Sequence, residues 1–120
     1  DVYKRQIHEE YRRRLSGVPG LSLLENPDSR YHSNHWLTCV QVNPEEARFD
    51  RETLRLALQK AGVESRPLWK PMHLQPVFRS CPFYGSGVSD RLFEEGLCLP
   101  SGASLAGEDM DRIIDVLLNL

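Results

Sequence analysis

The stretch from Glu64 to Phe78, ESRPLWKPMHLQPVF, concentrates four side chains that can bind a ligand. Arg66 can bind a carboxylate or a phosphate through two parallel hydrogen bonds, and Lys70 offers a point charge. His73 can donate or accept hydrogen bonds near neutral pH, and Trp69 offers a flat surface for stacking on a sugar or a base. These residue types predict that the stretch forms one wall of an active site.

Three prolines make this loop stiff. Pro67, Pro71 and Pro76 each fix their own φ angle and restrict the residue before them. A stiff loop loses less conformational entropy when a ligand binds, which favours a binding function.

Each of the four side chains also has a purely structural interpretation. Arg66 can pair with Glu64, Trp69 can fill the core, Lys70 can be solvated, and His73 can be a core histidine with satisfied hydrogen bonds. Their combination on one rigid segment favours binding over four separate structural roles.

A second polar stretch, YHSNHWLTC, places His32 and His35 three residues apart. Such a pair suggests a metal site, but no third ligand with the spacing of a metal site lies near in sequence, so we expect a loop-to-strand transition without metal. The chain shows no nucleophile elbow and no phosphate-binding glycine loop, since YGSGVSD lacks the following lysine and the preceding strand.

Composition excludes several classes of function. The 120 residues suit one domain, and the net charge of -2 does not indicate a nucleic acid or an anionic membrane as partner. No apolar run approaches the roughly 20 residues of a membrane span. Cys39, Cys81 and Cys98 form no CxxC pair, so we expect reduced thiols in a cytoplasmic protein, with Cys39 and Cys98 buried and inert.

The first six residues, DVYKRQ, are set apart from the rest. One back-translation of them is similar to the end sequence used in transposase-based sequencing adapters. We therefore expect residues 1–6 to be an adapter artefact and the true protein to continue upstream of Ile7, which leaves one domain over residues 7–120. The alternative is an ordinary helix start.

Periodicity predicts helices that alternate with short strands. We expect helices at residues 7–15, 51–61, 90–95 and 108–120, and strands at residues 21–24, 36–43, 63–66 and 96–100. Asp50 and Ser89 are the expected N-caps of the second and third helices. This order predicts an α/β (α+β) fold, a small two-layer sandwich of a short mixed sheet with helices on one face.

Several quoted motifs together resemble one enzyme family. ESRPLWKPMHLQPVF and VSDRLFEEGLCLPSGASLAGEDMDRIIDVL are similar to the C-terminal part of the DegT/DnrJ/StrS-type sugar aminotransferases, and SNHWLTCVQV and ETLRLALQKAGVESRP fit the same family. The resemblance covers residues 7–120. It implies the C-terminal small domain of a fold type I enzyme dependent on pyridoxal 5'-phosphate (PLP).

The resemblance also implies an activity. Such enzymes move an amino group from glutamate to the C4 ketone of a nucleotide-linked 4-keto-6-deoxy sugar, with PLP as the electron sink. The subgroup resembled makes UDP-4-amino-4,6-dideoxy sugars for surface polysaccharide and for pilin or other protein glycosylation. The family works as homodimers, and a large N-terminal domain carries the Schiff-base lysine and the other PLP contacts.

The chain departs from this family pattern by omission. Lys4, Lys60 and Lys70 are its three lysines, and none lies in the family's Schiff-base motif. We therefore expect no catalytic residue, no bound PLP and no activity in this chain alone, and its partner would be the missing PLP domain.

The resemblance transfers only substrate contacts to this chain. The expected set is Arg66, Trp69, Lys70 and His73, with Asn34 and His35 as weaker members on the same side. Two alternatives remain open: a free-standing small-molecule-binding or regulatory module, and a complete small enzyme with Lys70 as nucleophile.

Overall fold

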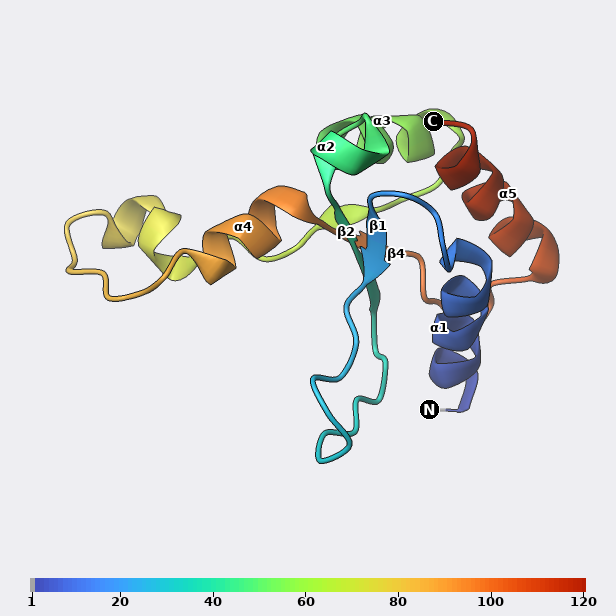
Figure 1. Ribbon diagram of the computed structural model, residues 1–120, viewed down its shortest axis with the longest axis horizontal. Coiled ribbons are helices and arrows are strands. Elements are labelled where there is room, and N and C mark those ends of the chain that lie inside the picture. The colour runs from blue at the N-terminus through green and yellow to red at the C-terminus, as the bar shows by residue number, and fades with distance from the viewer. Residues whose placement is uncertain (1) are drawn as a thin grey trace.

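The computed structural model describes residues 2–120 as a two-layer α/β sandwich with two projecting segments (Figure 1). In chain order the elements are α1 (Val2–Leu15), β1 (Leu21–Leu23), β2 (Thr38–Val42), α2 (Pro44–Ala47), α3 (Arg51–Lys60), β3 (Arg66–Pro67), the 3-10 turns η1 (Met72–Leu74) and η2 (Pro76–Phe78), α4 (Val88–Glu95), β4 (Gly96–Leu99) and α5 (Gly107–Leu118). The predicted fold class is confirmed.

The sheet has four strands in the order β1-β2-β4-β3. Every described strand pair is antiparallel, so the prediction of a mixed sheet is wrong in this detail. The cause lies between β3 and β4. There the chain runs out through η1 and η2 and returns through α4, so β4 comes back in the opposite direction to β3.

One face of the sheet carries the core. Val40 and Val42 on β2, together with Leu97 and Leu99 on β4, are almost fully buried. They contact a helix layer formed by α1, α3 and α5, as the buried stripes of these helices show. The helix layer contributes Tyr11, Leu15, Leu54, Leu58, Met110, Ile113, Ile114 and Leu117 to the same cluster.

Local chemistry explains where several helices begin. The Asp50 carboxylate accepts a hydrogen bond from the Thr53 N–H at 2.7 Å, which confirms the predicted N-cap of α3. The Ser89 cap is wrong, because α4 begins at Val88 after Gly87, which adopts a left-handed φ of 78°. We did not predict α2, although Asn43 caps it and Pro44 occupies its first turn.

The first helix is longer than predicted. It begins at Val2, and the Lys4 ammonium donates to the Ser101 carbonyl oxygen. The proposed adapter origin of residues 1–6 stays a prediction, since a helix forms from suitable residues whatever their source. Among the described helices, none combines the length and the apolar character needed to cross a bilayer.

Two segments project from the sandwich. The loop between β1 and β2 extends to one side, and the arm from β3 through η1 and η2 to α4 extends to another (Figure 1). The radius of gyration is 15.3 Å. A compact domain of this length has about 13.6 Å, so the projections are large relative to the core.

Gly96 allows the arm to contact the sheet closely. A Cβ atom at this position would overlap the Leu68 side chain and the Leu92 carbonyl oxygen. The Leu68 N–H also donates to the Gly96 carbonyl oxygen at 3.2 Å. The outer face of β4 is therefore covered at this point by the base of the arm.

We predict that Gly96→Ala lowers the free energy of unfolding by about 1–3 kcal/mol, because the backbone at Leu92 cannot move away as a side chain would. Urea unfolding followed by circular dichroism measures the loss. Gly107→Ala is the matched control, since its added Cβ meets open space at the start of α5. Equal stability of the two variants would contradict this account of Gly96.

Candidate functional site

Three stretches that are distant in sequence converge on one open cavity. It has a volume of about 580 Å³ and lies at the β3–β4 edge of the outer sheet face. Its walls come from Trp36 and Leu37, from the segment containing Arg66 and Trp69, and from residues 98–102. Ligand sites for small molecules occupy about 300–1,000 Å³, so this cavity has room for one.

Two exposed tryptophans stand at this cavity. The ring centroids of Trp36 and Trp69 are 6.3 Å apart with an angle of 39° between the ring planes. Trp36 is 62% exposed and Trp69 is 67% exposed, so neither fills the core. Exposed neighbouring aromatics are a surface for stacking on a flat ring.

Arg66 lies on β3 and pairs with Glu64. Two of its guanidinium nitrogens lie 2.7 and 2.9 Å from the same Glu64 carboxylate oxygen. Both side chains are largely exposed, and an exposed pair of this kind contributes little to stability. An anionic ligand can therefore replace Glu64 at small cost.

Residues 99–102 are supported from behind by α1. The Tyr11 hydroxyl donates to the Pro100 carbonyl oxygen at 2.9 Å, and burial raises the pKa of Tyr11. The Ser101 hydroxyl accepts from the Thr38 N–H at 3.0 Å and donates to the Leu99 carbonyl oxygen at 3.2 Å. Because its hydrogen bonds are satisfied internally, Ser101 shapes the cavity wall rather than offering a reactive group.

Lys70 and His73 lie further along the arm, outside the cavity lining. Lys70 is exposed. His73 stacks on Phe83 with centroids 3.7 Å apart, and its Nε2 lies 2.8 Å from the Asp90 carboxylate. A carboxylate accepts hydrogen bonds, so the Asp90 carboxylate accepts from an Nε2–H of His73 and fixes the orientation of the ring.

Asn34 and His35 face different surroundings. The Asn34 side chain accepts from the Trp36 N–H at 3.0 Å and so shapes the loop that presents Trp36. His35 stacks on His8 of α1, with ring centroids 3.8 Å apart. The structure therefore does not bring these two side chains together with Arg66 and Trp69.

Sequence reasoning missed His8. It is 4% exposed, and its ring nitrogens lie 3.3 Å from the Thr38 hydroxyl and 3.4 Å from the Glu25 carboxylate. No periodic or motif signal distinguishes it from the exposed polar residues of α1. Burial lowers the pKa of His35 because it disfavours a charged ring. The adjacent His8 lowers it further, because two positive charges repel.

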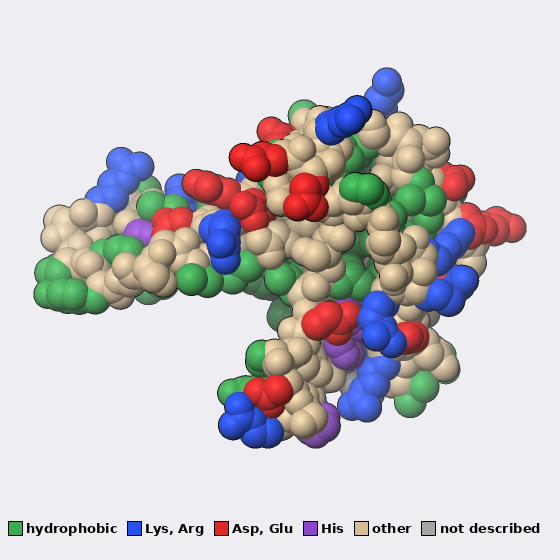
Figure 2. Space-filling model, viewed as in Figure 1, with side chains coloured by type: hydrophobic (Ala, Val, Ile, Leu, Met, Phe, Trp, Pro, Cys, Tyr) green, Lys and Arg blue, Asp and Glu red, His purple; other side chains and the backbone are tan. Residues whose placement is uncertain are grey.

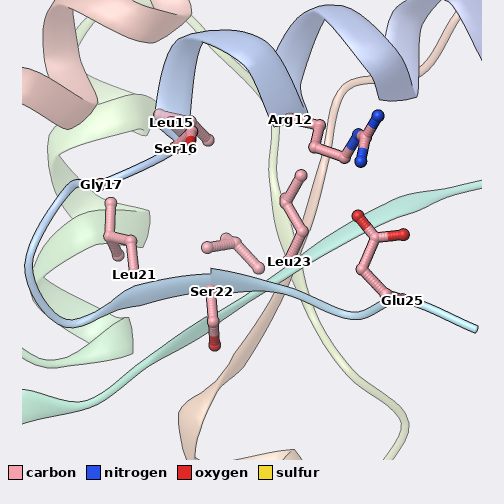
Figure 3. A pocket seen from close by; sticks show the side chains of 9 residues that line it. Arg12, Leu15, Ser16, Gly17, Leu21, Ser22, Leu23 and Glu25 are labelled. Carbon is pink, nitrogen blue, oxygen red and sulfur yellow. The ribbon is translucent and has the colours of Figure 1, made fainter. Parts of the chain in front are cut away.

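Two other hollows suit the predicted ligand less well. Figure 3 shows the first, between α1 and β1, where Arg12 and Glu25 lie near one end and Leu15, Leu21 and Leu23 contribute apolar side chains. Its volume of about 180 Å³ is small for a nucleotide sugar. The second, of about 790 Å³, carries three carboxylates and one arginine, so it disfavours an anion; these are Glu45, Glu46, Glu95 and Arg91.

The arm exposes apolar side chains as well. Figure 2 shows hydrophobic groups gathered at its far end and along one side. The exposed large hydrophobic residues of this segment are Trp69, Met72, Val77, Phe83, Tyr84 and Val88. Such a concentration marks a surface that contacts another molecule or another part of a protein.

Sequence comparison identifies the family. The signature of the DegT/DnrJ/EryC1/StrS aminotransferase family matches residues 2–118. The chain belongs to this aminotransferase family. The predicted resemblance is thus confirmed, and the match includes most of the segment that we attributed to an adapter.

Individual relatives agree with this family. The chain is 33% identical to EpsN of Bacillus subtilis (strain 168), whose name describes a pyridoxal phosphate-dependent aminotransferase; the match covers 98% of this chain and 30% of EpsN. It is 28% identical to GDP-perosamine synthase of Vibrio cholerae, over 97% of this chain and 31% of the relative.

A solved structure of the family matches the fold. The crystal structure of DesI in the presence of its TDP-sugar product superposes with a TM-score of 0.85 at 26% identity, over 98% of this chain and 30% of DesI. The chain therefore spans about 30% of the length of these relatives.

The positions of the three lysines bear on where a Schiff base to PLP could form. None of the three lysines lines the cavity of the tryptophan pair. Lys4 is bound to Ser101, while Lys60 ends α3 and Lys70 is exposed. Within residues 2–120 there is likewise no cluster of three or more His, Cys, Asp or Glu side chains that could hold a metal ion.

The stacked histidines predict a pH dependence of stability. Because the pKa of His35 is lowered in the folded chain, the unfolded chain binds its proton at a higher pH. The charged groups that act on His35 are Arg5, Glu9, Glu25 and His8. Above the ordinary histidine pKa of 6.5, His35 should not lower the free energy of unfolding. As the pH decreases below 6.5, the free energy of unfolding should fall, because the unfolded chain binds the proton more readily.

His35→Asn should reduce this pH dependence, and asparagine tolerates the left-handed φ of 50° at this position. Urea unfolding over a series of pH values measures the slope. His32→Asn is the control, since His32 is exposed in the same loop. A slope that His35→Asn leaves unchanged would show that the stacked pair does not cause it.

Proposed function

We propose that this chain is the C-terminal part of a PLP-dependent aminotransferase that acts on a nucleotide-linked sugar. The complete enzyme moves an amino group from glutamate to the C4 ketone of a 4-keto-6-deoxy sugar, for surface polysaccharide or protein glycosylation such as that of pilin. The convergence of the four family motifs on one cavity is the observation that carries this proposal. One relative is a GDP-perosamine synthase, and the structure of DesI was solved in the presence of its TDP-sugar product, which supports a nucleotide sugar as substrate. A UDP-sugar is our more specific proposal.

The tryptophan pair provides the stacking surface in this proposal. Trp36 and Trp69 leave enough aromatic area exposed for a nucleobase or a sugar ring. Arg66 lines the same cavity. When the ligand binds, Arg66 exchanges its exposed ion pair with Glu64 for an ion pair with a phosphate or carboxylate group of the ligand. Binding and orienting the substrate are therefore the work of this part of the chain.

The arm provides the remaining contacts. Lys70 adds a positive charge, and Asp90 holds the His73 ring so that it can hydrogen-bond substrate. Asn34 acts mainly by presenting Trp36, and His35 joins the loop to α1. We assign Arg66 and Trp69 to the centre of the substrate wall and Lys70 and His73 to its extension along the arm, while Asn34 and His35 support the loop that presents Trp36.

PLP belongs to a part of the enzyme outside these 120 residues in this proposal, because no lysine of the chain lies at the cavity. When bound there, PLP supplies the electron sink for amino transfer. The exposed apolar arm fits a docking role against that PLP domain or a second subunit of a homodimer. The setting we propose is the cytoplasm, where nucleotide sugars are substrates.

In the complete enzyme, Arg66→Ala and His73→Ala should each lower kcat/KM for the nucleotide sugar or glutamate roughly ten- to a hundredfold. This is the usual effect of losing a hydrogen bond to a charged group. Steady-state kinetics with each substrate varied in turn measures the loss. Arg112→Ala is the matched control, since it removes an exposed arginine of α5.

Unchanged kcat/KM for both substrates in both variants would overturn the substrate-wall assignment.

The alternative with Lys70 as nucleophile predicts a different result on this chain alone. It requires a covalent adduct of PLP at Lys70 that borohydride reduction traps for mass spectrometry. We expect no selective labelling of Lys70 over Lys60, because both are exposed.

A further inference from the structure

The sheet register brings two cysteines into contact. Cys39 on β2 lies directly opposite Cys98 on β4, and their sulfur atoms are 3.7 Å apart. Both thiols are free. The sequence predicted two separate, inert thiols, since 59 positions separate them along the chain.

The pair lies on the outer face of the sheet. Its neighbours along the two strands, Val40, Leu97 and Leu99, belong to the core cluster and face the helix layer. Side chains alternate between the two faces of a strand, so Cys39 and Cys98 point the other way. Cys98 lines the cavity of the tryptophan pair but is only 7% exposed, whereas Cys39 is half-buried. The cavity therefore leads to the pair, although little of Cys98 itself is exposed.

A hydrogen bond joins the two thiols, and either sulfur can be its donor. This hydrogen bond stabilises a thiolate on whichever sulfur accepts it, and the thiolate is the reactive form of cysteine.

The backbone geometry also permits a bond between them. Directly opposed residues of an antiparallel pair have Cα atoms about 4.5–5.5 Å apart. Disulfides form over Cα separations of about 4.4–6.8 Å. A bond between Cys39 and Cys98 requires side-chain rotation and no separation of the strands.

We propose that Cys39 and Cys98 form a redox-active dithiol site that reacts with low-molecular-weight disulfides and closes into a cross-strand disulfide. The pair is independent of the proposed aminotransferase activity, because the strand register alone brings it together. The oxidised form fastens β2 to β4 beside the cavity wall, and the reduced form leaves that wall held only by the sheet.

The reaction balances with oxidised glutathione as oxidant. The thiolate of one cysteine attacks one glutathione sulfur, which forms a mixed disulfide and releases one glutathione thiolate. The other cysteine then attacks the protein sulfur of this mixed disulfide, loses its proton to solvent, and displaces the second glutathione as thiolate. Two electrons pass from the protein to the glutathione disulfide, and the released thiolates take up the two protons.

The test is oxidation of the folded chain with oxidised glutathione, followed by acid quenching and non-reducing peptide mass mapping. We expect a Cys39–Cys98 crosslink with the loss of two hydrogen atoms, reversed by dithiothreitol. Cys81 is exposed and serves as the internal control, since it should carry only a glutathione adduct.

The same oxidation in urea separates folded geometry from chance pairing. Cys81 and Cys98 are 17 positions apart, whereas Cys39 and Cys98 are 59 apart. Loop-closure entropy alone then favours the Cys81–Cys98 crosslink about sixfold in the unfolded chain. The folded chain should show the reverse preference.

Two single variants test the pairing. Cys39→Ser and Cys98→Ser should each abolish the Cys39–Cys98 crosslink and leave the remaining cysteine of the pair as a glutathione adduct. The proposal is overturned if the folded chain gives no Cys39–Cys98 crosslink, or if folded and unfolded chains give the same distribution of crosslinks.

Discussion

Antiparallel pairing between β2 and β4 decides which side chains face the helix layer and which face the outer side of the sheet. The register sets Val40 opposite Leu97 on the helix side and Cys39 opposite Cys98 on the outer side. A shift by one residue would exchange the two sets and expose the apolar core, so burial of the helix layer holds the register. The cavity wall, the cysteine pair and the base of the arm all follow from this single alignment.

The molecule uses its two sheet faces differently. The inner face is a closed core with α1, α3 and α5. The outer face is covered near Gly96 by the arm and stays open around Cys98, where Trp36 and Trp69 stand exposed. Tryptophan rings exposed to water have a higher free energy than buried rings, and a bound ring or a docked surface removes this cost. The stability of the core and the binding surface are thus built on opposite sides of one sheet.

Short segments without regular structure perform most of the positioning. The stiff arm carries Trp69 to the side of Trp36. The Trp36 N–H donates a hydrogen bond to the Asn34 side chain, which orients Trp36. Behind the cavity, Tyr11 and Thr38 satisfy the polar groups of residues 100 and 101. The loops can stay open toward a ligand because helix α1 and strand β2 fix their ends.

The sequence by itself determined the elements whose signals are local. Asp50 began α3, the alternation of TCVQV produced β2, and the apolar stripe of α5 was readable at helical spacing. The motif pattern also identified the family and the loop that carries Arg66 and Trp69. These features depend on hydrogen bonds and side-chain periods within a few residues, so they are visible without a fold.

Only the tertiary structure decided which distant residues meet. It placed Trp36 beside Trp69, stacked His8 on His35, and brought Cys39 to 3.7 Å from Cys98. It also separated His73 from the cavity that Arg66 lines, although the two share one loop. These contacts depend on strand order and register, which are set by burial of the whole core rather than by any short stretch of sequence.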